Sequence, residues 1–271
     1  MNCSVEAVIG RSFDAEFQYP IPEIAPYVSR QTNSWSICYG EFRKARKQSN
    51  PDYDLLALHL GFYLASWGMY RGSSFLKALD YRIHYPAVKM MLEDQYRELF
   101  TIDPLANKDR YRELLFDPTC GIYCRLNTYY GKAHAAWPKS TNDDNESVTD
   151  TLITKILLGV YGCIPAYDIN FKEGVACFDG QKLLSVNGNA IWKPNGTNNR
   201  ALLTILENAT FRAELKRYAE DHDIPFMKAV DMYFFGLGFD CIVENARKKK
   251  AGEEQNARAE IEAELTALGY I

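Results

Sequence analysis

The stretch DYDLLALHLGFYLASWGM, residues 52–69, decides the fold. Its apolar side chains fall on nearly every face of a helix, whereas a surface helix of a globular protein keeps one polar face. The residues Ser49, Asn50 and Pro51 before it, with acids in the turn that follows, are typical of a helix start. We therefore expect a helix that lies in the middle of a helical bundle.

Helical patterns continue on both sides of this stretch. Apolar residues at helical spacing, separated by capping and turn residues, predict helices over residues 34–47, 84–100, 108–115, 122–137, 146–159, 199–206, 211–221, 225–237 and 257–268. The predicted fold class is mainly α, a multi-helix globular bundle in a single domain over residues 1–271.

Two segments depart from this helical pattern. Three prolines within residues 20–26 predict an extended N-terminal segment over residues 1–30. An Asp-Gly turn between two short apolar runs predicts a small β-hairpin over residues 175–186, inside an insertion that covers residues 175–194. Two strands do not make a β domain, so the predicted class remains mainly α.

The composition is that of a globular protein, with 271 residues of which 47% are hydrophobic. No apolar run reaches the roughly 18 uncharged residues that a membrane helix needs, and the start of the chain lacks a secretion signal, so we expect a cytoplasmic protein without membrane contact. The seven cysteines are scattered without metal-ligand spacing. We expect free thiols, most of them buried, and neither a metal nor another cofactor.

The charge pattern leaves contact with nucleic acid open. The formal net charge of −4 provides no general cationic field of the kind that nucleic-acid binders carry. Local basic clusters stand at Arg43, Lys44, Arg46 and Lys47, and again at residues 247–250. Each cluster is either a solvated helix face or a contact for DNA phosphates.

The first candidate site follows the apolar helix, at WGMYRGSS over residues 67–74. A charged Arg71 at the end of an apolar helix should reach water, pair with an acid or bind an anionic ligand. Ser73, Ser74 and the N–H groups of the next helix form a candidate anion site beside it. Trp67 and Tyr70 offer rings for stacking on a substrate. The alternative interpretation is that Arg71 and the serines only connect two helices.

The second candidate site is the turn IPAYD, residues 164–168, which follows a helix that ends near residues 159–162. Pro165 stiffens this turn and places Asp168 where the next helix can begin. The N–H groups of that helix would keep the carboxylate ionised. A fixed carboxylate at a cleft can stabilise a cationic transition state or activate water. The alternative is a plain helix N-cap.

The turn IPAYD resembles the catalytic turn of the helix-hairpin-helix DNA glycosylase superfamily. Proteins of that superfamily are all-α, and a Val-Pro-x-Asp turn carries their catalytic aspartate; here one more residue separates Pro165 from Asp168. The resemblance implies that Asp168 is catalytic and would stabilise a sugar cation or position water as a flipped base leaves. Residues 227–234 are similar to the late helix that packs behind the turn in some of these proteins.

This chain also departs from that superfamily. The glycine-bearing hairpin is missing, and no lysine stands at the place of the Schiff-base lysine, so the resemblance implies an atypical, monofunctional enzyme. Its substrate would be a modified or damaged base, in DNA repair or in defence against phage. Trp67, Tyr70 or Tyr167 would then stack on the extruded base, and the basic clusters would meet DNA phosphates.

Two other hypotheses remain open at the level of sequence. One is a non-enzymatic helical module in which Arg71, Ser73 and Ser74 hold an anionic small molecule or the carboxylate of a protein partner. The other is a scaffold whose last helix, residues 257–268, docks on a partner or on a second copy. The partners considered are thus DNA, a small anion or a protein, and the sequence leaves the oligomeric state open.

Overall fold

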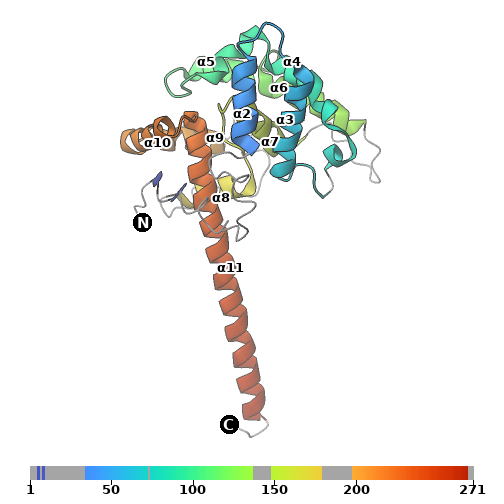
Figure 1. Cartoon of the computed structure of the whole chain (residues 1–271). Helices are drawn as coiled ribbons and strands as arrows, with labels where there is room; N and C mark the ends of the chain where they lie inside the picture. The colour runs from blue at the N-terminus through green and yellow to red at the C-terminus, as the bar shows by residue number, and fades with distance from the viewer. Residues whose placement is uncertain are drawn as a thin grey trace, which may run out of the picture.

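The computed structural model is mainly helical (Figure 1). It describes residues 5–6, 8–9, 34–72, 74–136, 148–178 and 197–267, and within these it describes only the backbone of residues 197–201 and 253–267. No strand occurs among the described residues, which confirms the mainly α class. The elements are α2 (Ser34–Ala45), α3 (Tyr53–Ser66), η2 (Phe75–Ala78), η3 (Tyr81–His84), α4 (Tyr85–Met91), η4 (Asp94–Phe100), α5 (Lys108–Phe116), α6 (Ile122–Ala135), α7 (Asp150–Val160), α8 (Ile169–Cys177), α9 (Thr197–Leu206), α10 (Ala209–Asp221) and α11 (Phe226–Ala267).

The centre of the bundle is α7 and not α3. Every residue of α7 from Leu152 to Val160 is buried, and the helix packs against α2, α3 and α6. Thr149 caps its N-terminus by accepting a hydrogen bond from the Leu152 N–H. A helix that is covered all round is expected to be apolar all round, and from Leu152 to Val160 the exceptions in α7 are Thr154 and Lys155.

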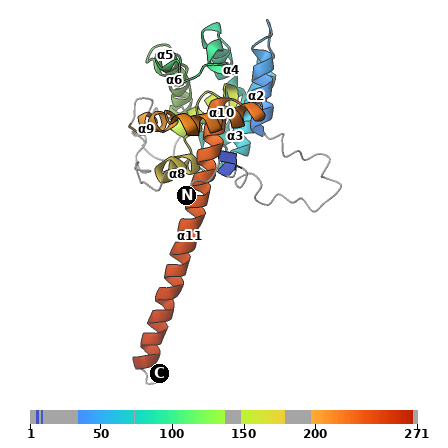
Figure 2. The ribbon, with the colours of Figure 1, turned by 90° about the vertical axis from the view of Figure 1, so that its left-hand side faces the viewer.

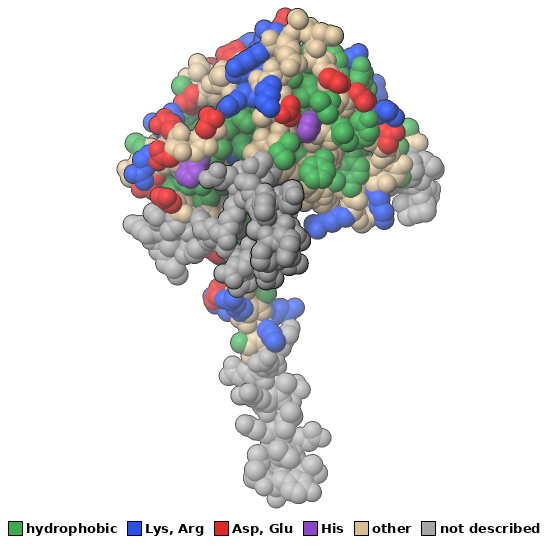
Figure 3. All heavy atoms as spheres, in the orientation of Figure 1, with side chains coloured by type: hydrophobic (Ala, Val, Ile, Leu, Met, Phe, Trp, Pro, Cys, Tyr) green, Lys and Arg blue, Asp and Glu red, His purple; other side chains and the backbone are tan. Residues whose placement is uncertain are grey.

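The prediction that the apolar helix α3 is fully buried is wrong. Its cap is Asp52, one of the acids expected in the first turn, and not Ser49 or Asn50. Leu55, Leu58 and Phe62 are 44%, 46% and 61% exposed. Figure 3 shows hydrophobic side chains gathered on this face of the body. The opposite face packs against α2, α4, η3 and α7. The side chains of that buried face are Leu56, Ala57, Leu60, Tyr63 and Leu64.

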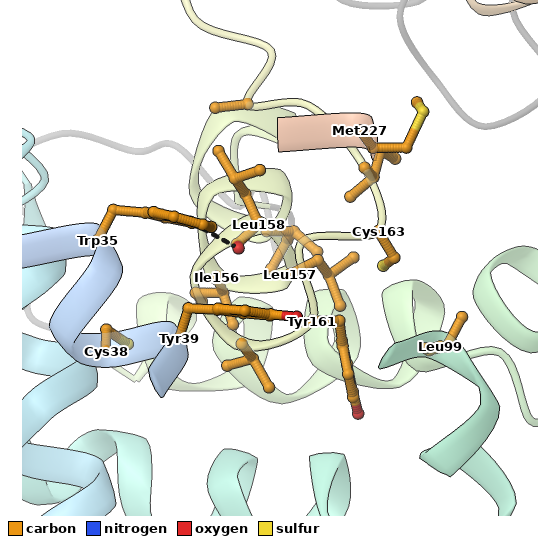
Figure 4. Close-up of a cluster of buried hydrophobic side chains, with 14 of the residues drawn as sticks. Trp35, Cys38, Tyr39, Leu99, Ile156, Leu157, Leu158, Tyr161, Cys163 and Met227 are labelled. Atoms are coloured by element: carbon orange, nitrogen blue, oxygen red, sulfur yellow. Dashed lines mark hydrogen bonds between the residues drawn. The ribbon is translucent and has the colours of Figure 1, made fainter. Parts of the chain in front are cut away.

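Aromatic side chains tie α2 to the central helix. The Trp35 Nε1–H donates to the carbonyl oxygen of Leu158 at 2.9 Å, a contact drawn in Figure 4. Tyr39 stacks on the Trp35 ring with centroids 5.2 Å apart. A buried indole needs such a partner for its N–H. This bond fixes α2 across α7.

Two glycines allow α8 and α11 to cross at backbone contact. A Cβ added at Gly238 would stand 1.7 Å from the Asn170 oxygen, and one added at Gly174 would stand 1.8 Å from the Phe234 oxygen. Neither position can therefore carry a larger side chain without moving a helix. The crossing holds the first part of α11 against the body, beside the start of α8.

The helix α11 is much longer than expected. It runs unbroken for 42 residues, about 60 Å, and joins two helices that the sequence predicts as separate. Its second half extends away from the rest of the described chain in both views (Figures 1 and 2). Within the described part of the chain, no helix is both long enough and apolar enough to span a membrane.

Three other predicted segments need correction. The expected first strand of the hairpin is helical, because residues 175–177 belong to α8, and the rest of the insertion from residue 179 to 194 lies outside the described residues. The expected extended N-terminal segment contains helical residues at 5–6 and 8–9, and its other residues lie outside the description. The helix expected over residues 84–100 is interrupted between α4 and η4.

Candidate functional site

The end of α3 is shaped by a glycine turn. Gly68 adopts φ +76°, and the N–H groups of Gly68 and Met69 donate back to the carbonyl oxygens of Ala65 and Leu64. This is the glycine-capped ending that commonly closes a helix. The turn leaves the Trp67 carbonyl pointing out of the helix and its ring half-buried against Phe235.

Lys155 joins this turn to the second candidate site. Its Nζ donates to the Trp67 carbonyl oxygen at 3.0 Å and lies 3.5 Å from the Asp168 Oδ2. It also lies 5.7 Å from the centroid of the Trp67 ring, within cation–π range. The side chain is 7% exposed, so these contacts replace nearly all of its water. The two segments predicted separately from the sequence therefore meet at one ammonium group.

Asp168 is both a helix cap and a member of this ion pair. Its backbone is extended at φ −85°, and its Oδ1 accepts from the Phe171 N–H at 3.0 Å, so Asp168 caps α8, as the alternative interpretation of this turn required. The side chain is 15% exposed. Burial raises the pKa of Asp168 above its ordinary value, although Lys155 and the Phe171 N–H act in the opposite direction.

A second buried ion pair lies against the same turn. Lys228 Nζ and Asp231 Oδ2 are 2.8 Å apart, with side chains 5% and 8% exposed. Asp231 Oδ1 accepts from the Ala166 N–H at 2.9 Å, which ties α11 to the turn before α8. Lys228 lies 5.1 Å from the Trp35 ring centroid and 5.8 Å from that of Trp67. The third segment singled out in the sequence, residues 227–234, thus reaches the turn too.

Together these side chains form what we call the Lys–Asp cluster: Lys155, Asp168, Lys228 and Asp231. Two hydroxyl groups of α7 hold the backbone next to Asp168. Thr154 Oγ1 accepts from the Tyr167 N–H, and Thr151 Oγ1 donates to the Tyr167 carbonyl. Chemically the cluster holds two rigid carboxylates and two ammonium groups beside a half-buried tryptophan. Such a group of charges can hold a polar substrate, stabilise developing charge or transfer a proton.

The aromatic side chains expected to stack on a substrate differ in their availability. Tyr167 is 1% exposed and stacks on Phe171, so the prediction that it stacks on an extruded base is wrong. Tyr70 is half-buried, and its hydroxyl is 2.7 Å from the Nε2 of His84, whose Nδ1 is 2.7 Å from the Tyr130 hydroxyl. Trp67 is the candidate that both touches the Lys–Asp cluster and keeps exposed surface.

The expected anion site at Arg71, Ser73 and Ser74 has few of its elements in place. Arg71 is exposed and folds back over Gly68, while the Ser74 hydroxyl donates to the Met69 carbonyl at 2.6 Å. Ser74 makes no side-chain cap for the four-residue η2 that follows, and Ser73 lies outside the described residues. In the described part of this segment the contacts are those of a connection between helices.

The basic cluster at the end of α2 is largely engaged within the protein. Arg43 pairs with Asp223 at 3.2 Å, and Lys44 pairs with Glu41 at 2.7 Å. The Arg46 guanidinium lies 4.8 Å from the centroid of the Phe100 ring. Lys47 is exposed. Surface pairs of this kind are weak, so these side chains could exchange their partners for phosphates at small cost.

Three members of the Lys–Asp cluster were not identified from the sequence. Lys155 stands in an apolar helix, where its charge is the signal that could have identified it. Lys228 and Asp231 form an i, i+3 pair within a predicted amphipathic helix. The contact between Lys155 and Trp67 could not be read from the sequence, because the two residues are 88 positions apart.

No protein-family model, curated protein or solved structure matches this chain. The Lys–Asp cluster itself must therefore carry any proposal about function.

Proposed function

We propose that the protein is a DNA glycosylase-like hydrolase that excises a modified or damaged base, with Asp168 as the carboxylate that stabilises the sugar cation or positions water. The observation that carries this proposal is the buried contact between Asp168 and Lys155 beside the half-exposed Trp67. Buried ionised pairs add little net stability, because desolvation offsets their attraction, so a buried pair of this kind is a candidate for a functional role.

The geometry gives each side chain a separate task. Asp168 cannot rotate freely, because the Phe171 N–H holds one oxygen and Lys155 lies against the other. A carboxylate held in this way costs little reorganisation when positive charge develops on a sugar ring. Trp67 supplies a ring on which a base could stack, and stacking contributes roughly 1–3 kcal/mol per base. Lys47 and Arg71 are exposed cations that could meet phosphates.

The decisive experiment compares two helix caps. Purified protein is incubated with duplex and single-stranded oligonucleotides that carry a panel of modified bases, and abasic sites are detected by alkaline cleavage. Asp168→Asn should abolish base release, because it removes the charge, yet it should keep the fold, because asparagine caps a helix as well as aspartate does. Asp52→Asn makes the same change at the cap of α3, away from the cluster, and should leave activity intact.

Two results would contradict this function. The first is the absence of base release from every oligonucleotide in the panel. The second is full activity of Asp168→Asn at unchanged folding, measured by circular dichroism, because a purely structural cap would give that result.

A further inference from the structure

A second site is indicated by a cavity of about 540 Å3 where four segments meet: the end of η4, the turn after α7, the end of α10 and the start of α11. Pockets that hold small organic molecules have volumes of roughly 300–1,000 Å3. No member of the Lys–Asp cluster lines this cavity. It is therefore separate from the proposed catalytic centre.

The deeper walls of the cavity are apolar and already formed. Figure 4 shows four of the lining side chains within the core: Leu99, Tyr161, Cys163 and Met227. The Tyr161 hydroxyl donates to the Met91 carbonyl at 2.5 Å, so its polar end is satisfied outside the cavity.

A glycine fixes the shape of one wall. Gly162 adopts φ +64°, and a Cβ placed on it would stand 2.3 Å from Pro225 Cγ. The turn after α7 therefore packs directly on the start of α11. This close contact makes the wall rigid, so a ligand would enter a preformed site.

The rim of the cavity carries one charge that lacks an ion pair. Asp103 pairs with Lys216 at 2.7 Å, and Asp223 pairs with Arg43 at 3.2 Å. The structure describes all the charged residues that line the cavity. Of these, Glu220 is exposed and is the one without an ion-pair partner. A cavity that combines buried apolar side chains with an unpaired carboxylate favours a molecule with an apolar body and a cationic end.

We propose that this cavity binds an organic cation, an aryl-alkylamine in chemical class, whose ring fills the apolar interior and whose ammonium group meets Glu220. Asp103 and Asp223 reinforce this preference for positive charge, because each stands on the same rim. The neighbouring Lys216, already bound to Asp103, opposes the entry of a cation less than a free lysine would.

The test uses three probes of nearly equal shape: phenethylamine, phenethyl alcohol and hydrocinnamate. Binding to the full chain is measured by isothermal titration calorimetry and by ligand-observed NMR. The amine should bind about fivefold more tightly than the alcohol, the effect of one partly exposed ion pair of about 1 kcal/mol. The acid should bind more weakly than both.

Three variants locate the site. Glu220→Gln should remove most of the amine's advantage over the alcohol, whereas Asp221→Asn, at an adjacent exposed carboxylate that does not line the cavity, should preserve the preference. Ala219→Leu adds a side chain to the lining and should block all three probes.

The proposal is overturned if the alcohol binds as tightly as the amine, if Glu220→Gln keeps the preference, or if no probe binds at millimolar concentration. The Glu220→Gln and Asp221→Asn pair decides the matter even if Ala219→Leu fails to fold. These results do not depend on base release, so failure here and failure of the proposed function are distinguishable.

Discussion

The coupling between Lys155 and Asp168 can be measured by a double-mutant cycle. Lys155→Met keeps the volume of the side chain but removes the bond to the Trp67 carbonyl and the partner of Asp168. Removing one member of a buried pair costs about 3 kcal/mol, because it leaves the other charge without a partner. Asp168→Asn keeps the cap of α8 and leaves Lys155 its carbonyl acceptor, so we expect a smaller loss of about 2 kcal/mol.

The free energy of unfolding of the double variant should fall by no more than about 3 kcal/mol, because no unpaired charge remains. The two single losses together exceed this value by about 2 kcal/mol, which is the coupling energy. Urea unfolding at neutral pH, followed by circular dichroism and by tryptophan fluorescence, gives the four free energies of unfolding. Purely additive losses, within about 0.5 kcal/mol, would refute the ion pair.

The same cycle has a pH dependence of defined sign. The pKa of Asp168 is raised in the folded state, so the folded protein binds this proton more tightly than the unfolded chain does. Protonation of Asp168 therefore favours the folded state. Its contribution to the free energy of unfolding is fully present below about pH 3.8 and is lost as the pH rises through the folded-state pKa. The coupling to Lys155 runs in the opposite direction, because it requires the charged carboxylate and should vanish in acid.

Two further predictions concern the fold. Gly238→Ala should lower the free energy of unfolding by about 3 kcal/mol, because its Cβ would meet the Asn170 oxygen. The control Gly252→Ala, in the same helix, meets nothing within 4 Å and should not lower it. Equal urea midpoints for the two variants would contradict the close crossing of α8 and α11. Burial lowers the pKa of His84 to about 3, so the protein should lose stability as the pH falls from about 6.5 towards 3, and His84→Phe should reduce this loss. NMR titration of the His84 ring checks the cause, since protonation at about pH 6 would show that the ring is not buried between its two tyrosines.

The sequence predicts the parts of the site that depend on neighbouring residues. The cap at Asp168 needs only the extended residue itself and the N–H three positions later, so it is readable from a short segment. Lys155 could not be assigned in the same way, since a lysine in an apolar helix is commonly interpreted as reaching the surface. Its role depends on the end of α3, which only the folded chain brings near.

Apolar patterns also left ambiguities that packing resolves. The run that begins at Val175 has the length and composition of a strand, and short apolar runs do not distinguish a strand from a buried helix. The contact between Gly174 and α11 favours the helix, because it brings two helical backbones together. For α3, the sequence shows that every face is apolar but not which face has a neighbour, and Phe62 remains exposed.

The free-energy cost of burying the Lys–Asp cluster is an argument for the proposed function. Apolar residues of similar volume could fill the same space without desolvating four charges, and such replacements are often neutral or stabilising in other proteins. Here each ammonium group is balanced by a carboxylate, and each also lies against a tryptophan ring. The arrangement reduces the cost of burial but does not remove it. If stability were the only role, replacing both lysines by methionine and both aspartates by asparagine, which still accepts from the Phe171 and Ala166 N–H groups, would leave every activity intact. The proposed function requires that such a variant remain folded and lose base release.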